Sequence, residues 1–266
     1  MDPSINVVLL WALFAGTHVG LTTDRPRTFL VNRLGEWAFT GVFSVVALTT
    51  YVLLIRYFAV HRFEGVAGPA LGTTPVVGWA LFALSALGAA LMSLSLFDYP
   101  VSAHAIGARR GEYVPRPIER ISRHGFFAGL AILGLAHALL ASRLVGSVFF
   151  GCLVLFTWFG SLHQDRRLLA ARGDVHRRYL ASTSTLPFAA VMAGRQSLDL
   201  RGIPLVAWLA AVLAPVLLRT SHDSIFAADG AYVIGVTGGG AAVATLQSWR
   251  LQQRASRAAA AASPSP

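Results

Sequence analysis

The sequence predicts an all-α fold, a polytopic transmembrane helix bundle of about seven spans with an interfacial cytoplasmic helical segment. Of the 266 residues, 55% are hydrophobic and only 13% are charged. Soluble domains are nearer to a quarter charged, so the composition alone indicates an integral membrane protein whose main partner is the lipid bilayer. The apolar residues also fall into long runs, and a bilayer core needs about 20 such residues per helix.

Seven apolar runs are long enough to span the bilayer or nearly so. They lie at residues 5–22, 37–56, 75–97, 125–141, 144–163, 203–218 and 226–247. The fourth and sixth runs are short, and we expect their helices to extend into the membrane interface. Residues 1–250 are therefore expected to form a single integral-membrane domain.

The arginines predict the orientation of this domain. All 22 basic residues are arginine, and if the N-terminus is outside, 18 of them fall in inner loops and the tail and 4 fall outside. This asymmetry is a strong positive-inside signal. The prediction is a multi-pass protein of the bacterial inner membrane with its N-terminus outside and its C-terminus cytoplasmic. The arginines are scattered rather than gathered in one stripe, so no nucleic acid is expected as a partner.

Two segments lie outside the spans. Residues 164–202 alternate arginines with Leu, Ala and Tyr at helical spacing, which predicts a helix on the cytoplasmic surface that covers the inner mouth of the bundle. Arg166 and Arg167 are expected there to pair with acidic lipid headgroups. Residues 251–266 have no periodic apolar face and are expected to be a disordered tail.

Histidines are the candidate functional groups. Three are expected to be solvated in loops: His61, His104 and His176. Five lie in or beside the spans: His18, His124, His137, His163 and His222. Ionisable groups in a bilayer are costly and usually face the bundle interior, and neutral histidine is the commonest metal ligand. His124 and His137 share one helix at a separation of roughly 20 Å, so they cannot bind the same metal ion.

Several stretches carry a resemblance to a known family. They are THVGLTTDRPRTFLVNRLGEWAFTGVFSVVAL near the start, and ISRHGFFAGLAILGLAH, DRRLLAARGDVHRRY and STSTLPFAAVMAGRQ between residues 120 and 196. Over roughly residues 8–196 the chain resembles the NnrU family of bacterial membrane proteins, which includes the 15-cis-zeta-carotene isomerase of plants and cyanobacteria. The bacterial members are associated with nitric oxide and nitrite metabolism, that is with denitrification, and this association does not define a reaction.

The resemblance implies a cofactor and a substrate class. The plant member uses haem b with histidine axial ligands to isomerise a cis double bond of a linear carotene. The resemblance therefore implies haem b, an apolar polyene substrate, and iron ligands at His18 and His137. Arg166 and Arg167 would then pair with the haem propionates. Two positions depart from the family pattern, because Gly125 replaces a proline and Gly134 replaces a cysteine of the plant enzyme.

The depth of the histidines leaves other pairings open. His18 lies toward the inside and His137 toward the outside, with depths that differ on the order of 10–15 Å in untilted helices. Pairing His18 with His124, and His137 with His222, are the alternatives. His124 is expected instead to hold the start of its helix against residues 164–202 or to line the substrate entrance.

Two other functions also remain open, and the sequence assigns no catalytic residue. One is a non-catalytic membrane protein linked to nitrogen-oxide metabolism, such as an assembly or haem-carrier protein. The other is a membrane methyltransferase of the isoprenylcysteine type. Arg123-His124-Gly125 and Gln164-Asp165 look like degraded forms of the signatures with which those enzymes hold S-adenosylmethionine.

Overall fold

The computed structural model describes residues 2–98 and 114–262, and its regular structure there is helical. The predicted all-α fold class is thereby confirmed. Within the described residues the β-type pairing is limited to an isolated bridge between Ala67 and Arg143. His104 and the arginines at 109 and 110, which were assigned to an inner loop, lie outside the described residues.

Each of the seven predicted spans is a helix. The long helices are α1 (Pro3–Gly20), α3 (Glu36–His61), α4 (Pro75–Asp98), α6 (Gly125–Leu140), α7 (Leu144–Arg172), α10 (Leu205–Thr220) and α12 (Ala227–Ala262). The short helices are α2 (Asp24–Leu34), η1 (Leu71–Thr73), α5 (Pro117–Ile121), α8 (Asp174–Ser182), α9 (Ala189–Met192) and α11 (His222–Ile225).

Four of these helices are long and apolar enough to cross a membrane: α1, α3, α4 and α7. The helices α6 and α10 are apolar but only 16 residues long, which is below the ~20 residues that a bilayer core requires. The start of α12 is interrupted by residues 228–230, whose φ angles are positive, and its apolar run includes a polar aspartate.

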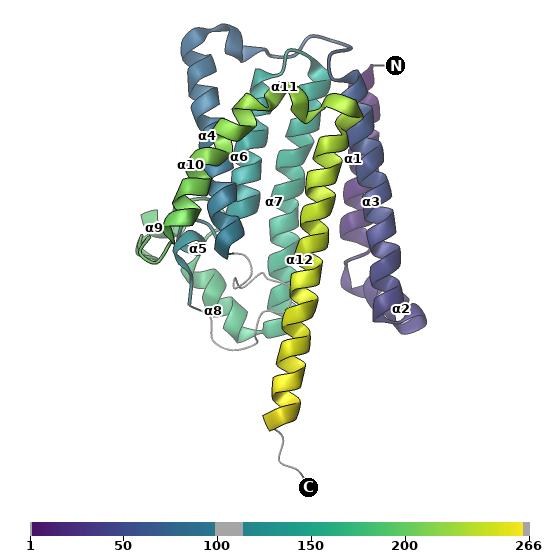
Figure 1. Ribbon diagram of the computed structural model, residues 1–266, viewed down its shortest axis with the longest axis vertical. Helices are drawn as coiled ribbons and strands as arrows, with labels where there is room; N and C mark the ends of the chain where they lie inside the picture. The colour runs from purple at the N-terminus through teal and green to yellow at the C-terminus, as the bar shows by residue number, and fades with distance from the viewer. Residues whose placement is uncertain (1, 99–113, 263–266) are drawn as a thin grey trace.

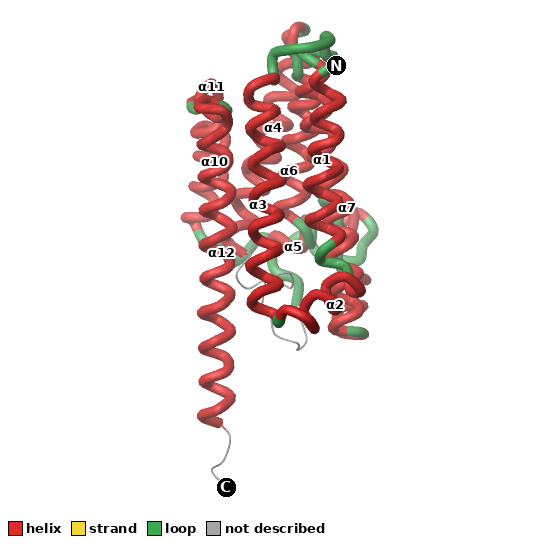
Figure 2. Tube along the Cα trace, turned by 90° about the vertical axis from the view of Figure 1, so that its right-hand side faces the viewer, coloured by secondary structure: helices red, strands yellow, loops and turns green. Residues whose placement is uncertain are grey.

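The helices form a main bundle and a second, thinner layer. Within the bundle, α4 packs on α6, α6 on α7, α7 on α1 and α1 on α3. In the second layer, α10 packs on α4 and α12 on α3, and both contact α11 (Figures 1 and 2). We call the end that carries α11 the upper end of the bundle, and the end that carries α2 and α8 the lower end (Figure 1).

Small residues and aromatic rings hold the bundle together. The helices α4 and α6 approach closely because a Cβ atom at Gly129 would lie 2.5 Å from the Gly88 carbonyl oxygen. Such glycine contacts are typical of packed membrane helices. Between α3 and α7, the rings of Phe58 and Phe149 stack with their centroids 3.9 Å apart. Both belong to a buried apolar cluster that includes Trp11.

Two boundaries differ from the sequence prediction. The helix expected to end near residue 163 continues to Arg172, so the surface segment begins only after Gly173, where φ is +55°. The helix α8 then covers the lower end, as predicted, and buries His176, which was expected to be solvated. Residues 251–262 of the expected disordered tail belong to α12, because alanine has the highest helix propensity; residues 263–266 lie outside the described part.

Candidate functional site

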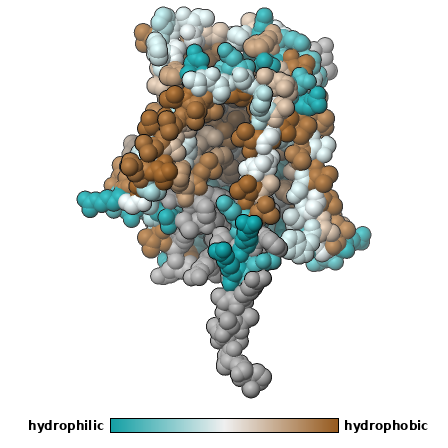
Figure 3. Space-filling model, in the orientation of Figure 1, coloured by the Kyte–Doolittle hydropathy of each residue, from teal (hydrophilic) through white to brown (hydrophobic). Residues whose placement is uncertain are grey.

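A large groove separates the two layers of the molecule. It has a volume of about 1710 Å³ and is lined by α1, α3, α4, α6, α7 and the α10–α12 layer. Most of the residues that line it are aliphatic or aromatic. In Figure 3 it is visible as a hollow with largely hydrophobic walls between α10 and α12. This opening faces sideways, toward the space that lipid occupies around a membrane bundle.

His137 and His222 come together at the upper end of the groove. Their ring centroids are 6.1 Å apart and their planes are inclined by 24°. The Nδ1 atom of His137 lies 2.8 Å from the Leu133 carbonyl oxygen, which can only accept a hydrogen bond. His137 therefore carries its proton on Nδ1 in the neutral state, and its Nε2 lone pair is left as the potential metal ligand. Both histidines line the groove.

His18 lies elsewhere in the bundle. Its ring is enclosed by Phe14, Phe43 and Phe156, at centroid distances of 5.4, 5.1 and 5.9 Å. Its Nδ1 atom is buried and has no hydrogen-bond partner among the described residues. His18 is not among the residues that line the groove.

The α7 residues that contact His18 and His137 show how far apart the two histidines are in depth. His137 contacts Phe150 at a centroid distance of 4.9 Å, whereas His18 contacts Phe156. Six residues of helix correspond to about 9 Å along its axis. The structure therefore brings His137 to His222 and does not bring it to His18. The ligation of one iron by His18 and His137 stays a prediction.

The centroid spacing of the upper histidine pair, whose rings are stacked, is in the range of two imidazole ligands of one metal ion. With a metal–nitrogen bond of about 2 Å and a ring centre roughly 1 Å behind each nitrogen, two opposed ligands place their ring centroids about 6 Å apart. The observed distance is 6.1 Å. The groove also exceeds the roughly 300–1,000 Å³ of an ordinary small-molecule pocket. Within the described residues, no group of three or more His, Cys, Asp or Glu side chains is arranged to hold a metal ion.

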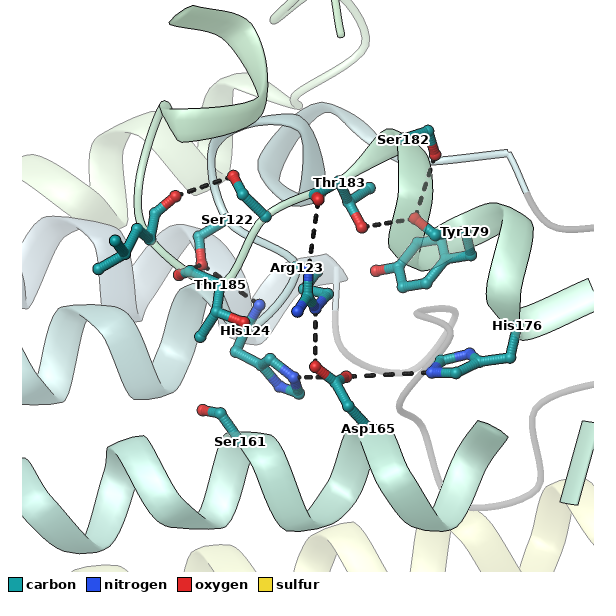
Figure 4. Close-up of polar contacts among 12 residues, drawn as sticks. Ser122, Arg123, His124, Ser161, Asp165, His176, Tyr179, Ser182, Thr183 and Thr185 are labelled. Carbon is teal, nitrogen blue, oxygen red and sulfur yellow. Dashed lines mark hydrogen bonds and ion pairs between the residues drawn. The ribbon is translucent and has the colours of Figure 1, made fainter. Parts of the chain in front are cut away.

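A buried polar network occupies the lower end of the groove (Figure 4). The Asp165 carboxylate on α7 accepts hydrogen bonds from Arg123 Nε and His124 Nε2, each at 2.8 Å. His176 Nε2 lies 3.9 Å from the same carboxylate. Burial holds the pKa of His176 below its ordinary value, and the Asp165 charge opposes this shift only in part.

The same region ties the start of α6 to the segment after α8. Ser122 Oγ donates to the Thr185 carbonyl at 2.7 Å, and Arg123 Nη1 donates to the Thr183 carbonyl at 3.2 Å. His124, which lies beside these contacts, is bonded to Asp165 and so helps to hold the start of its helix against residues 164–202, as predicted. It also lines the groove. The sequence identifies His124 as a candidate but not the central role of Asp165. An acidic residue at the end of an apolar run was the sequence feature that could have indicated this role.

The arginines of the groove are not those expected from the sequence. Arg166 and Arg167 are exposed on α7 and do not line it. Arg62, Arg143 and Arg219 line its upper end instead, and sequence reasoning missed them because they come from the ends of different helices that are far apart in the chain.

Comparison with known proteins places the chain in a family. The chain is 29% identical over 197 residues to the chloroplastic 15-cis-zeta-carotene isomerase of Arabidopsis thaliana, covering 74% of this chain and 53% of that protein. It is 28% identical over 194 residues to the isomerase of the same name from Zea mays, covering 73% and 52%. The chain thus spans about half the length of these relatives, and no solved structure matches it. The family described as NnrU protein matches residues 6–229, and the chain belongs to this family.

Proposed function

We propose that this protein is a membrane isomerase that moves a linear, apolar polyene between cis and trans forms inside the groove, with haem b bound at the upper end. The observation that carries the proposal is the apolar groove with His137 and His222 facing each other at one end. The relatives support it, because both are named as isomerases of a cis carotene.

The shape of the groove suits a substrate that is dissolved in the membrane. A polyene has no hydrogen-bonding groups, so its binding depends on the burial of apolar surface. The lining supplies aromatic and aliphatic side chains over most of the length of the bundle. Because α10 is packed on α4 and α12 on α3, the side between α10 and α12 is left for lateral entry of the substrate from the lipid.

The histidines would hold the cofactor in a defined orientation. The Leu133 carbonyl fixes the His137 ring and keeps its proton on Nδ1, as a hydrogen bond to the non-coordinating nitrogen does for a metal-ligating histidine. Phe150 packs against the same ring. Bound haem would supply an iron centre able to exchange an electron with the polyene system, and its axial ligands would set its potential.

We also propose that the upper end faces the outside of the bacterial inner membrane. The arginine-rich helices α2 and α8 both lie at the lower end (Figure 1), which agrees with the positive-inside rule.

The proposal is tested by incubating the purified, haem-loaded protein under reducing conditions with a linear carotene that has a central cis bond, and separating the isomers chromatographically. Conversion to the trans isomer is expected. Ala86→Trp, which places an indole in the groove, should slow it strongly. Ala83→Trp is the matched control, because Ala83 lies on the same helix but is exposed and does not line the groove.

An absence of conversion by the haem-loaded wild type would contradict the proposal. Methyl transfer from S-adenosylmethionine to a prenylated thiol would replace it with the methyltransferase interpretation.

A further inference from the structure

We propose that the upper mouth of the groove is a carboxylate-binding site, in which Arg143 and Arg219, supported by Arg62, receive the two propionates of the haem. This inference rests on the proposed function, because it assigns the polar end of the same cofactor site. It also replaces the expectation from the sequence that Arg166 and Arg167 would serve this purpose.

The charged residues of the groove are divided between its two ends. Those at the lower end are Glu119 and Arg123, and both are engaged within the protein. The Glu119 carboxylate accepts from the Arg116 backbone N–H at 3.0 Å, and Arg123 binds Asp165. These lower groups are therefore committed to the buried network and do not form a ligand site.

The upper end has an excess of positive charge. Arg62, Arg143 and Arg219 line it, and Asp223 is the acidic residue beside them in the described part of the groove. Among the residues that line this end of the groove, three arginines less one aspartate leave a net charge of +2, equal in size to the charge of the two haem propionates. The acidic residues at the same end that do not line the groove are held by other partners: Asp2 by Ser4 and Val66, Glu64 by His61, and Asp229 by Arg56. Asp223 is fully exposed, so water screens its charge strongly.

The chain brings these arginines to the histidine end. Arg219 precedes His222 by three residues, at the join of α10 and α11. Arg143 lies in the turn that follows α6, which carries His137 near its end. Backbone hydrogen bonds from Gly68 to Ser142 at 2.9 Å and from Leu144 to Val66 at 2.8 Å fasten the loop after α3 to this turn. Arg62, which follows α3 directly, is held at the same end.

The guanidinium groups of Arg62, Arg143 and Arg219 retain N–H donors that a ligand can use. Arg143 donates one hydrogen bond, to the Gly65 carbonyl at 3.2 Å, and Arg62 donates to the Ala59 carbonyl while lying over the Phe63 ring. Arg219 has no side-chain hydrogen bond or ion-pair partner among the described residues. A guanidinium has five N–H donors in a planar fork that matches a carboxylate. Each arginine can therefore bind a propionate without giving up its present contacts.

The test compares haem with its dimethyl ester, in which both propionates are esterified while the iron and the ring are unchanged. Apoprotein in neutral detergent is titrated with each compound, and binding is followed by the shift of the Soret band. The wild type should bind haem more tightly than the ester. Arg219→Gln and Arg143→Gln should each weaken haem binding by about twofold to fivefold, the order expected for an exposed arginine–carboxylate pair, and should leave the affinity for the ester unchanged.

Arg167→Gln is the matched control, because Arg167 is equally a surface arginine but lies outside the groove. It should leave both affinities unchanged. Equal wild-type affinities for haem and ester, or an effect of Arg167→Gln as large as that of Arg219→Gln, would overturn the inference. Loss of the preference for haem when phosphatidylglycerol is added to the detergent would assign the arginines to lipid headgroups instead. If neither compound binds, the proposed haem site itself fails.

Discussion

Replacing Asp165 with alanine should cost more stability than any exposed ion pair of this protein. Asp165 has a side chain that is only 8% exposed, and it receives both the Arg123 guanidinium, 14% exposed, and the His124 ring at 2.8 Å. Asp165→Ala would leave a buried guanidinium without its counter-charge. Breaking a buried pair in this way costs about 3–5 kcal/mol. For a chain of this size, 1 kcal/mol corresponds to a shift of roughly 2–4 °C in Tm.

The expected result is a fall in Tm of about 6–20 °C, measured by thermal unfolding of the purified protein in detergent. The control is Asp174→Ala, which removes an ion pair with Arg177 at 2.6 Å whose side chains are more than 70% exposed. Such pairs contribute about 0–1 kcal/mol, so Tm should change by no more than about 4 °C. Similar shifts for the two variants would refute the conclusion that Asp165 is the centre of a buried network.

Three further predictions concern packing, pH and orientation. Gly129→Ala should destabilise the protein by about 1–3 kcal/mol in detergent unfolding, because its Cβ would meet the α4 backbone, whereas Gly151→Ala, with open space around it, should not. Because burial lowers the pKa of His176 below its ordinary 6.5, the unfolded state binds the proton first. Stability should therefore fall as the pH drops below about 6.5, and His176→Gln should remove part of that fall; an unchanged pH profile would contradict this. Reporter fusions at Ala67 and Arg250 should report opposite sides of the membrane, and the same side for both would refute the proposed topology.

The sequence predicts the helices well because a bilayer imposes a simple pattern. Runs of about 20 apolar residues identify spans regardless of how those spans pack, and all seven became helices. The small boundary errors arise where the helix continues past the apolar run. The helix α7 extends to Arg172 because the stretch that follows the apolar run, residues 164–172, contains no glycine or proline, and the first glycine after it is Gly173. The alanine-rich end of α12 is helical because hydropathy does not report helix propensity.

The site was harder to predict from the sequence than the helices were, because it depends on which helix packs against which. The sequence identifies His18, His137 and His222 as histidines in or beside the spans, and it offers His137 with His222 only as an alternative to the pair that the family resemblance implies; the structure brings this alternative pair together. Depth along the helix axis argues against placing His18 opposite His137, and the structure agrees with this through Phe156 and Phe150. The lateral groove could not be predicted, since it results from the way α10 and α12 pack on different neighbours.

The central claim is that His137 and His222 hold the haem iron between them. It is tested most directly by the visible spectrum of haem-loaded protein in three variants: His137→Ala, His222→Ala and His18→Ala. An axial ligand determines both haem retention and the position of the absorption bands. We predict that His137→Ala and His222→Ala each lose or shift the Soret and α/β bands, while His18→Ala keeps the wild-type spectrum. A wild-type spectrum in His222→Ala together with loss of the Soret band in His18→Ala would contradict the claim.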